Sequence, residues 1–306
     1  MNKPPFPLLA ALGLTIGFAQ GCQSPEPMSD DAPATQPDAD PHGHAERPDP
    51  LTPATQAGEA PSDDVDASTV YDDIPVISIE HGQRSTIGES VRGLPIHAYR
   101  FEGDPNLAPL LIVGGIHGSE PDSARLTQYW LERFASASPP PGLPTIVAVP
   151  FANPDGLLLG KRGNVNGVDL NRNFPAENFR ARERYGTEPL SQPESRALHK
   201  LIESLNPGVI LTIHQPLVCV DHDGPGSVVL AERIAKVVDL PVKKLGARPG
   251  SLGSWAGEVR GAVVVTLELP SLNDTPRGEA ELWTRYGPAF DATLDYASTP
   301  PAPTAP

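Results

Sequence analysis

Cysteine is scarce in this chain, which has only Cys22 and Cys219 among its 306 residues. A fold held together by several disulfides is therefore excluded, and the folded part must be stable through its hydrophobic core. Basic residues are also few, 23 against 38 acidic residues, and they form no stripe of the kind that nucleic-acid binding requires. We therefore expect no nucleic-acid partner.

A long hydrophobic run is missing too, because the apolar stretch at residues 7–19 is too short to span a bilayer as a stable anchor. It closes on Ala19-Gln-Gly-Cys22, which resembles a bacterial lipoprotein cleavage box with alanine in place of the usual leucine. We expect residues 1–22 to be a lipoprotein signal peptide and Cys22 to carry the lipid that binds the membrane. The alternative is an ordinary secretory signal, and either one exports the chain. Gln23, where inner-membrane lipoproteins often have aspartate, favours a periplasm-facing envelope lipoprotein of the outer membrane.

Most of the net charge of −15 lies in residues 23–73, which hold thirteen acidic residues and one basic residue, Arg47. Pro, Ala, Ser and Thr fill most of the remainder. This composition has too little apolar surface to offset the entropy of ordering, so we expect a disordered tether. A second disordered tail is expected at residues 298–306. Residues 74–297 then form a single domain with a sizeable core.

Short runs rich in β-branched residues alternate with helical patterns in residues 74–297. This order predicts an α/β fold with a mixed, mostly parallel sheet flanked by helices. The predicted strands are Ile96–Phe101, Leu110–Gly114, Thr145–Val149, Val209–Ile213 and Ala262–Leu267. The predicted helices are Pro121–Ala135, Gln192–Leu205, Val228–Val238 and Gly278–Tyr296. Ligands of such sheets gather at the carboxyl ends of the strands. The stretch 153–190 has few apolar residues, and we expect a functional loop there.

Four chemically active side chains lie at the ends of these strands. His117 and Glu120 follow one strand, and His214 and Glu268 end two others. Two histidines and one glutamate, with a fourth position open to water, form the ligand set of a catalytic zinc site. A second glutamate that does not bind the metal can deprotonate the water. Each residue alone is weak evidence, although a carboxylate inside an apolar strand such as Glu268 is costly unless it is functional. Together they predict a zinc hydrolase.

The segment from Arg162 to Pro175 carries two arginines and several amides in a loop. Such side chains can form a cradle for a substrate carboxylate and a developing oxyanion. The alternative is a polar surface loop, which the density of side chains capable of bidentate hydrogen bonding disfavours.

Several motifs, taken together and in order, resemble the zinc carboxypeptidase family over residues 84–290. They are the His117–Glu120 pair, Asn153-Pro-Asp-Gly156, Asn171-Arg-Asn173, the strand ending at His214, and Thr266-Leu-Glu-Leu-Pro270. The resemblance implies a single catalytic domain of the zinc carboxypeptidase fold. It also implies one Zn²⁺ ion per chain, bound by His117, Glu120 and His214.

The same resemblance implies roles for the remaining site residues. Glu268 becomes the general base and later the proton donor, and Arg162 stabilises the tetrahedral oxyanion. Asn171 and Arg172 hold the free carboxylate of a peptide substrate. The mobile tyrosine of digestive carboxypeptidases is not located, because the loop at residues 249–255 has none.

Within the family, the likeness is nearest to members that cleave peptidoglycan peptides at the γ-D-glutamyl-meso-diaminopimelate bond. It is carried by residues 160–175, 191–194, 214–219 and 249–255. We therefore expect such a peptide as substrate, either in the envelope or from outside the cell. Lys244 and Arg248 lie near the last segment, and they either meet a second substrate carboxylate or are ordinary exposed side chains.

Three other functions remain open from the sequence. A general metallocarboxypeptidase would release C-terminal residues from ordinary peptides, and a deacylase of N-acyl amino acids shares the same His-x-x-Glu pair. A non-enzymatic zinc-binding lipoprotein is the alternative from another class. That last reading leaves Glu268 and Arg162 without a role.

Overall fold

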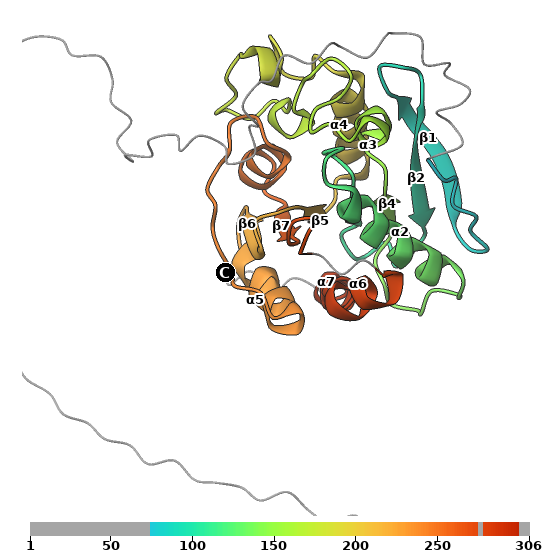
Figure 1. The fold of residues 1–306 in the computed structure, drawn as a ribbon. Helices are drawn as coiled ribbons and strands as arrows, with labels where there is room; N and C mark the ends of the chain where they lie inside the picture. The colour runs from blue at the N-terminus through green and yellow to red at the C-terminus, as the bar shows by residue number, and fades with distance from the viewer. Residues whose placement is uncertain (1–73, 275–277, 300–306) are drawn as a thin grey trace, which may run out of the picture. The chain divides into compact units, whose positions relative to one another are not determined.

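A seven-stranded mixed sheet forms the centre of the protein in the computed structural model, which describes residues 74–274 and 278–299. The strand order is β1-β2-β4-β3-β5-β7-β6 (Figure 1). The strands are β1 (Gln83–Glu89), β2 (Pro95–Phe101), β3 (Leu110–Val113), β4 (Ile146–Val149), β5 (Val209–His214), β6 (Cys219–Asp223) and β7 (Val263–Glu268). Neighbours among β4, β3, β5 and β7 are parallel, whereas β1, β2 and β6 pair antiparallel. The predicted mixed α/β sheet is confirmed.

The central parallel strands are buried along their whole length. Every residue of β3, β4 and β5 is buried, which explains why these segments are continuously apolar or nearly so. Because parallel strands end at one edge of a sheet, β3, β5 and β7 deliver the residues that follow them to the same place. His214 and Glu268 are register partners at that edge.

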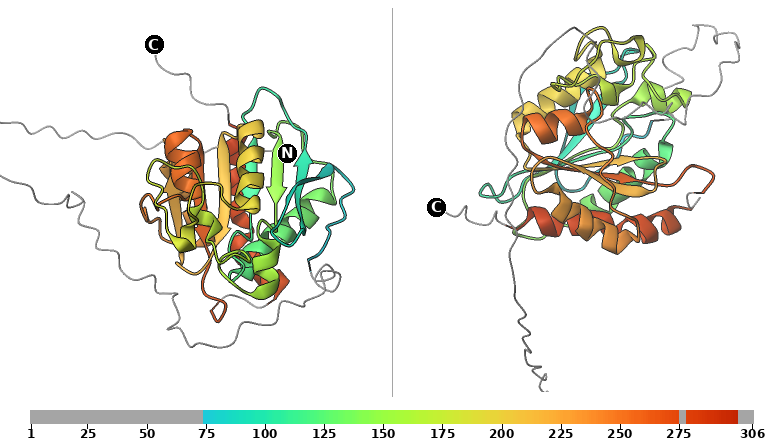
Figure 2. Two further views of the ribbon diagram at one scale, coloured as in Figure 1. Left: turned by 90° about the horizontal axis from the view of Figure 1, so that it is seen from above. Right: turned by 90° about the vertical axis from the view of Figure 1, so that its left-hand side faces the viewer.

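Helices cover the sheet on both faces, and Figure 2 shows the two layers on either side of it. One hydrophobic cluster includes α2 (Pro121–Ala135), α5 (Ser227–Val238), α6 (Glu279–Tyr286) and α7 (Pro288–Ala297). The other includes α4 (Pro193–Leu205), the 3₁₀ helix η2 (Leu170–Arg172) and the π-helix η4 (Gly253–Val259). Two further short helices are α3 (Pro154–Leu159) and η3 (Glu183–Tyr185). Stacked rings mark both clusters, Trp130 on Phe290 in the first and Phe174 on Trp255 in the second.

The predicted elements agree with the structure to within one or two residues, apart from three differences. The helix expected at Gly278–Tyr296 is two helices, α6 and α7, separated at Gly287. Pro288 begins the second helix, where a missing backbone N–H is tolerated. Strands β1 and β6 were not predicted. The stretch 153–190 contains α3, η2 and η3 rather than loop alone.

The expected signal peptide, lipidated Cys22 and tether lie outside the described residues, as does most of the expected tail. Among the described residues, no helix is both long and apolar enough to cross a membrane.

Candidate active site

His117 and Glu120 lie on the short connection between β3 and α2. The connection turns sharply at Gly115, which has a φ of 63°. Gly118 packs so closely on the backbone of Gly156 that a Cβ atom would lie 1.8 Å from the carbonyl carbon. A side chain cannot be accommodated there, so glycine is required for the connection to fold back against α3. The connection holds both side chains in the interior, where His117 is 2% and Glu120 3% exposed.

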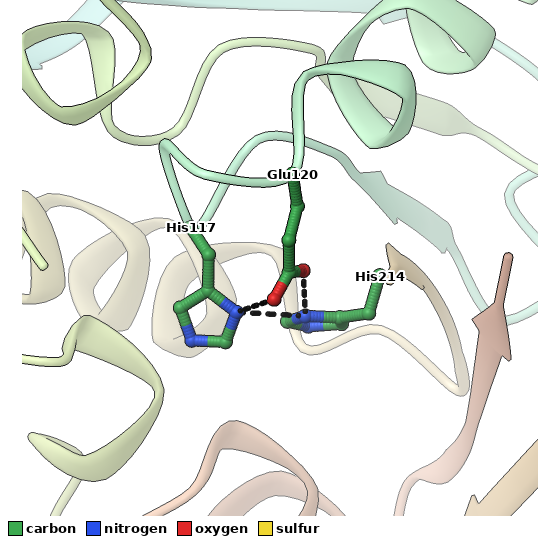
Figure 3. A group of neighbouring side chains, drawn as sticks. All are labelled: His117, Glu120 and His214. Carbon is green, nitrogen blue, oxygen red and sulfur yellow. Dashed lines mark hydrogen bonds and ion pairs between the residues drawn. The ribbon is translucent and has the colours of Figure 1, made fainter. Parts of the chain in front are cut away.

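His214 joins this pair from the end of β5. His117 Nδ1 lies 2.8 Å from Glu120 Oε1, and His214 Nδ1 lies 3.0 Å from Glu120 Oε2 (Figure 3). The two Nδ1 atoms are 3.1 Å apart. One ligand atom from each of the three residues lies within 4.8 Å of the others. The structure thus brings His214 to a pair of residues that lie 97 and 94 positions earlier in the chain.

The geometry of this group fits a metal ion. One ring nitrogen from each histidine and one carboxylate face a common point, where their lone pairs can bind a cation. Nitrogen and oxygen donors of these kinds suit zinc. Burial alone would raise the pKa of Glu120, but the charges and hydrogen bonds of His117 and His214 outweigh it and hold that pKa well below its usual range. A positive charge at this point therefore offsets the cost of burying the carboxylate.

Asp169 was not predicted from the sequence, yet it contacts the same group. Its Oδ1 lies 2.9 Å from His117 Nε2, on the side of the ring opposite Glu120. Burial opposes ionisation of Asp169, but His117, Arg162 and Arg172 hold its pKa well below the usual range. A carboxylate bonded to the far nitrogen fixes the orientation of a metal-binding histidine. The feature of the sequence that could have indicated Asp169 is its position between Arg162 and Asn171 in the arginine-rich loop.

Arg162 reaches into the group from the loop after α3. Its Nη1 donates to Glu120 Oε1 at 3.0 Å, and its Nε donates to Asp169 Oδ2 at 2.9 Å. These two contacts aim the guanidinium at the three converging residues. Arg162 therefore lies directly beside this group.

Asn171 and Arg172 lie on η2, and Asn171 is beside the His214 ring nitrogen that does not face Glu120. Asn171 Nδ2 is 3.5 Å from His214 Nε2, while Asn171 Oδ1 accepts a hydrogen bond from the backbone N–H of Leu252 at 2.9 Å. That second bond fixes the amide so that its NH₂ group faces the site. Arg172 Nη1 donates to the Asn171 carbonyl oxygen at 2.6 Å. A nitrogen-donor pair of this kind can bind a carboxylate.

Glu268 ends β7 beside the three converging residues, directly across from His214 in the parallel register. It is 8% exposed, and Leu217 N–H donates to its Oε2 at 3.4 Å. Burial raises the pKa of Glu268, and the negative charge of Glu120 adds to this effect while His214 opposes it. A carboxylate with a raised pKa is a better proton acceptor than an exposed one.

Gln215 lies in the segment 214–219 that carries the resemblance, but the sequence assigned it no role. Its backbone N–H donates to Glu120 Oε2 at 3.1 Å, and its side-chain Oε1 accepts from the N–H of Asp122 at 3.2 Å. Its Nε2 donates to the carbonyl oxygen of Pro270 at 2.8 Å, just beyond Glu268. Gln215 therefore ties the ends of β5 and β7 to the start of α2, which fixes the spacing of the site.

Three further residues named from the sequence are placed as follows. Cys219 is fully buried and is not among the residues that converge. Lys244 and Arg248 are exposed on the loop between α5 and η4.

The fold and the site together define a metallohydrolase built on an α/β sheet, and comparisons with known proteins narrow this class. The sequence profile of the family described as zinc carboxypeptidase matches residues 80–217. Murein peptide amidase A of Escherichia coli (strain K12) is 34% identical over 222 residues, which span 67% of this chain and 86% of the relative. The enzyme of the same name from Vibrio campbellii is 31% identical over 207 residues, 62% of this chain and 80% of the relative.

Solved structures agree with this assignment. The crystal structure of a murein-tripeptide amidase from Escherichia coli O157 superposes with a TM-score of 0.56 at 28% identity, over 74% of this chain and 95% of that one. Thrombin-activatable fibrinolysis inhibitor shares the fold, with a TM-score of 0.60 at 18% identity over 72% of this chain and 71% of that one. The chain belongs to the zinc carboxypeptidase family, and it is an enzyme of the metallocarboxypeptidase type.

Proposed function

We propose that this enzyme is a zinc-dependent amide hydrolase that cleaves peptidoglycan peptides at the γ-D-glutamyl-meso-diaminopimelate bond. The observation that carries the proposal is the convergence of His117, Glu120 and His214 beside the buried carboxylate of Glu268. The similarity to murein peptide amidase A supports the choice of substrate.

One zinc ion, held by His117, Glu120 and His214, would supply Lewis-acid polarisation and lower the pKa of water at the site. Glu268 accepts a proton from that water, which its raised pKa favours. It later gives the proton to the departing amine.

Two groups of donors hold the substrate during this reaction. Arg162, aimed by Glu120 and Asp169, stabilises the negative oxygen that develops on the scissile carbonyl. Asn171 and Arg172 bind the free carboxylate of the released residue, because the Leu252 contact turns the Asn171 NH₂ group toward the site. The substrate is thereby oriented with its amide bond between Glu268 and Arg162.

A comparison of two peptides tests the substrate. Purified enzyme should hydrolyse L-Ala-γ-D-Glu-meso-diaminopimelate much faster than an ordinary L-peptide, should stop in a chelator, and should recover when zinc is restored. Faster release of a C-terminal residue from the L-peptide would instead indicate a general metallocarboxypeptidase. Hydrolysis of N-acyl amino acids alone would indicate a deacylase. Zinc uptake without hydrolysis of any of these would indicate a non-enzymatic zinc-binding protein.

We further propose that the enzyme is an exported lipoprotein anchored through Cys22 in the cell envelope, facing the periplasm and held in the outer membrane. The support is the Ala19–Cys22 cleavage box, followed by Gln23 rather than aspartate. Mass spectrometry of the mature N-terminus should find a lipidated cysteine at position 22. A processed chain that starts elsewhere and carries no lipid contradicts the anchor, and fractionation of the two membranes tests the location.

A further inference from the structure

Strand β6 places two acidic side chains on the same face of the sheet as Glu268. Its antiparallel pairing with β7 sets Cys219 opposite Glu268, Asp221 opposite Thr266 and Asp223 opposite Val264 (β6 and β7 in Figure 1). Alternate residues of a strand share a face, so Asp221 and Asp223 continue along β6 from the position opposite Glu268. The neighbouring Val264 on this face belongs to the hydrophobic core. Carboxylates in such surroundings require an explanation.

Neither carboxylate is neutralised by a close cation among the described residues. Asp221 is 8% exposed, and its Oδ1 accepts a hydrogen bond from the N–H of Leu245 at 2.8 Å. Asp223 is 6% exposed, and its buried Oδ1 has no hydrogen-bond partner in the described part of the chain. Burial, followed by the charge of Asp221, raises the pKa of Asp223 to about 7. These are the surroundings in which an added cation gives the largest electrostatic gain.

The loop that follows α5 runs from the neighbourhood of Asp221 to that of Arg172, one of the two residues expected to bind the substrate carboxylate. Lys243 N–H donates to the Val220 carbonyl oxygen on β6, so the loop begins beside Asp221. It ends against η2, where a Cβ on Gly250 would lie 2.3 Å from the Arg172 carbonyl oxygen. Arg248 lies between these two attachments and is exposed. Its charge acts on Asp221 and opposes the increase in the pKa of Asp221 that burial causes.

We propose that Asp221, together with the unpartnered oxygen of Asp223, binds a second ammonium group on the released residue, and that Arg248 binds the second carboxylate. The site then recognises a diamino dicarboxylic acid by both of its amino-acid ends. This inference rests on the proposed function and assigns the residues that select its substrate. Asp221 and Asp223 lie about 7 Å and 14 Å along β6 from the position opposite Glu268, at about 3.4 Å per residue. The extended three-methylene chain of diaminopimelate can carry its second ammonium about as far as the nearer of these two positions, that of Asp221.

Four peptides that differ only in the released residue test the assignment. Each is L-Ala-γ-D-Glu-X, where X is meso-diaminopimelate, L-lysine, L-2-aminopimelate or L-norleucine, so that ammonium and carboxylate are removed separately. Asp221→Asn keeps an oxygen for the Leu245 N–H but removes the charge. It should lower kcat/KM for the diaminopimelate and lysine peptides about 10- to 100-fold, mainly through KM, as expected for a charged hydrogen bond. The norleucine and 2-aminopimelate peptides should be unaffected.

Arg248→Gln should instead affect the two peptides that carry the second carboxylate. The loss should be about 2- to 5-fold for the diaminopimelate and 2-aminopimelate peptides, because exposed ion pairs are weaker. Glu258→Gln and Lys244→Gln are the matched controls, an exposed acid near Asp223 and an exposed base on the same loop. Both should leave the order of the four peptides unchanged. An equal loss on all four peptides in Asp221→Asn, or no loss on any, overturns the assignment.

Calorimetric binding of free meso-diaminopimelate and free norleucine separates this inference from the proposed function. If the wild-type enzyme cleaves the peptides but binds both free amino acids equally, the inference is wrong and the proposed function stands. If no peptide is cleaved but Asp221→Asn abolishes a preference for free diaminopimelate, the proposed function is wrong and the inference stands.

Discussion

Strands β5 and β7 present two different faces of the same sheet. On one face, Leu211 and Ile213 of β5, with Leu267 of β7, belong to the hydrophobic cluster that includes α5 and α7. On the other face, the alternate residues of β5 and β7 include His214 and Glu268 at the strand ends. In both strands the odd positions therefore pack into this cluster. The even positions Ile210 and Val264 pack into the second cluster, and the last even position of each strand carries the chemistry. The two roles can be changed independently because successive side chains point to opposite faces.

The largest expected effect comes from removing a proposed metal ligand on the face of the sheet that carries His214 and Glu268. His214→Ala should abolish zinc binding and reduce hydrolysis more than ~10³-fold, because the metal supplies both a nucleophile and charge stabilisation. The packing of Leu211 and Leu267 on the opposite face is untouched, so the fold and its near-ultraviolet circular dichroism spectrum should persist. Zinc content by atomic emission, measured with the rate, checks this. A variant with full zinc and a normal rate shows that His214 is not a ligand.

A smaller effect is expected when the metal stays and the base is lost. Glu268→Gln preserves the shape of the side chain, so zinc should remain bound while kcat falls by at least ~10²-fold, the scale of general acid–base catalysis. The matched control is Glu258→Gln, an exposed glutamate, which should turn over normally. If Glu268→Gln works at the wild-type rate, the base lies elsewhere.

The opposite face should respond with stability instead of rate. Leu211 is fully buried, and Leu211→Ala should lower the free energy of unfolding by about 2–5 kcal/mol through the cavity it leaves. Turnover per folded, zinc-loaded molecule should stay within about twofold of the wild type. Urea unfolding and active-site titration measure the two quantities separately. A large fall in turnover at full folding would show that the two faces are coupled.

The smallest effect concerns the pH dependence of stability. Burial, with the charges of Asp221 and Glu258, raises the pKa of Asp223 to about 7 in the folded state, and Lys244 opposes this. In the unfolded chain the same group titrates near ~3.9. Because only the unfolded state ionises between these values, the free energy of unfolding falls as pH rises from about 4 to about 7.

Asp223→Asn removes this loss, so its gain in the free energy of unfolding over the wild type should be greater at pH 8 than at pH 4. The difference should be on the order of 2 kcal/mol, because even a side chain 6% exposed retains some hydration. The exposed Asp239→Asn serves as control, and calorimetry at the two pH values measures the gain. An equal gain at both pH values shows that Asp223 titrates normally.

The parts of the fold that the sequence predicted are those with local signals. β3 and β4 are apolar throughout and β5 is nearly so, and His117 follows β3 while His214 ends β5. β1 is polar and largely exposed, and β6 carries two aspartates in five residues, so neither has the composition of a strand. Both form at the edges of the sheet, where pairing with a neighbour decides the conformation.

The candidate site also contains residues that have a local sequence signal and residues that have none. His117 and Glu120 are three residues apart, and the family's motifs mark the others, so the ligand set could be predicted. Asp169 and Gln215 act through partners 52 and 95 residues away in the chain, His117 and Glu120 respectively. No local spacing encodes such a contact, and only the folded structure reveals it.

The sole thiol among the described residues gives this enzyme an internal reporter. Cys219 is fully buried opposite Glu268, and burial, followed by the charge of Glu268, raises its pKa to about 11. Alkylating reagents attack the thiolate, so the folded protein should resist them. The rate at which maleimide labels Cys219 would therefore report the rate of transient opening of β6. This edge strand lies beside the catalytic centre, and no added probe is needed.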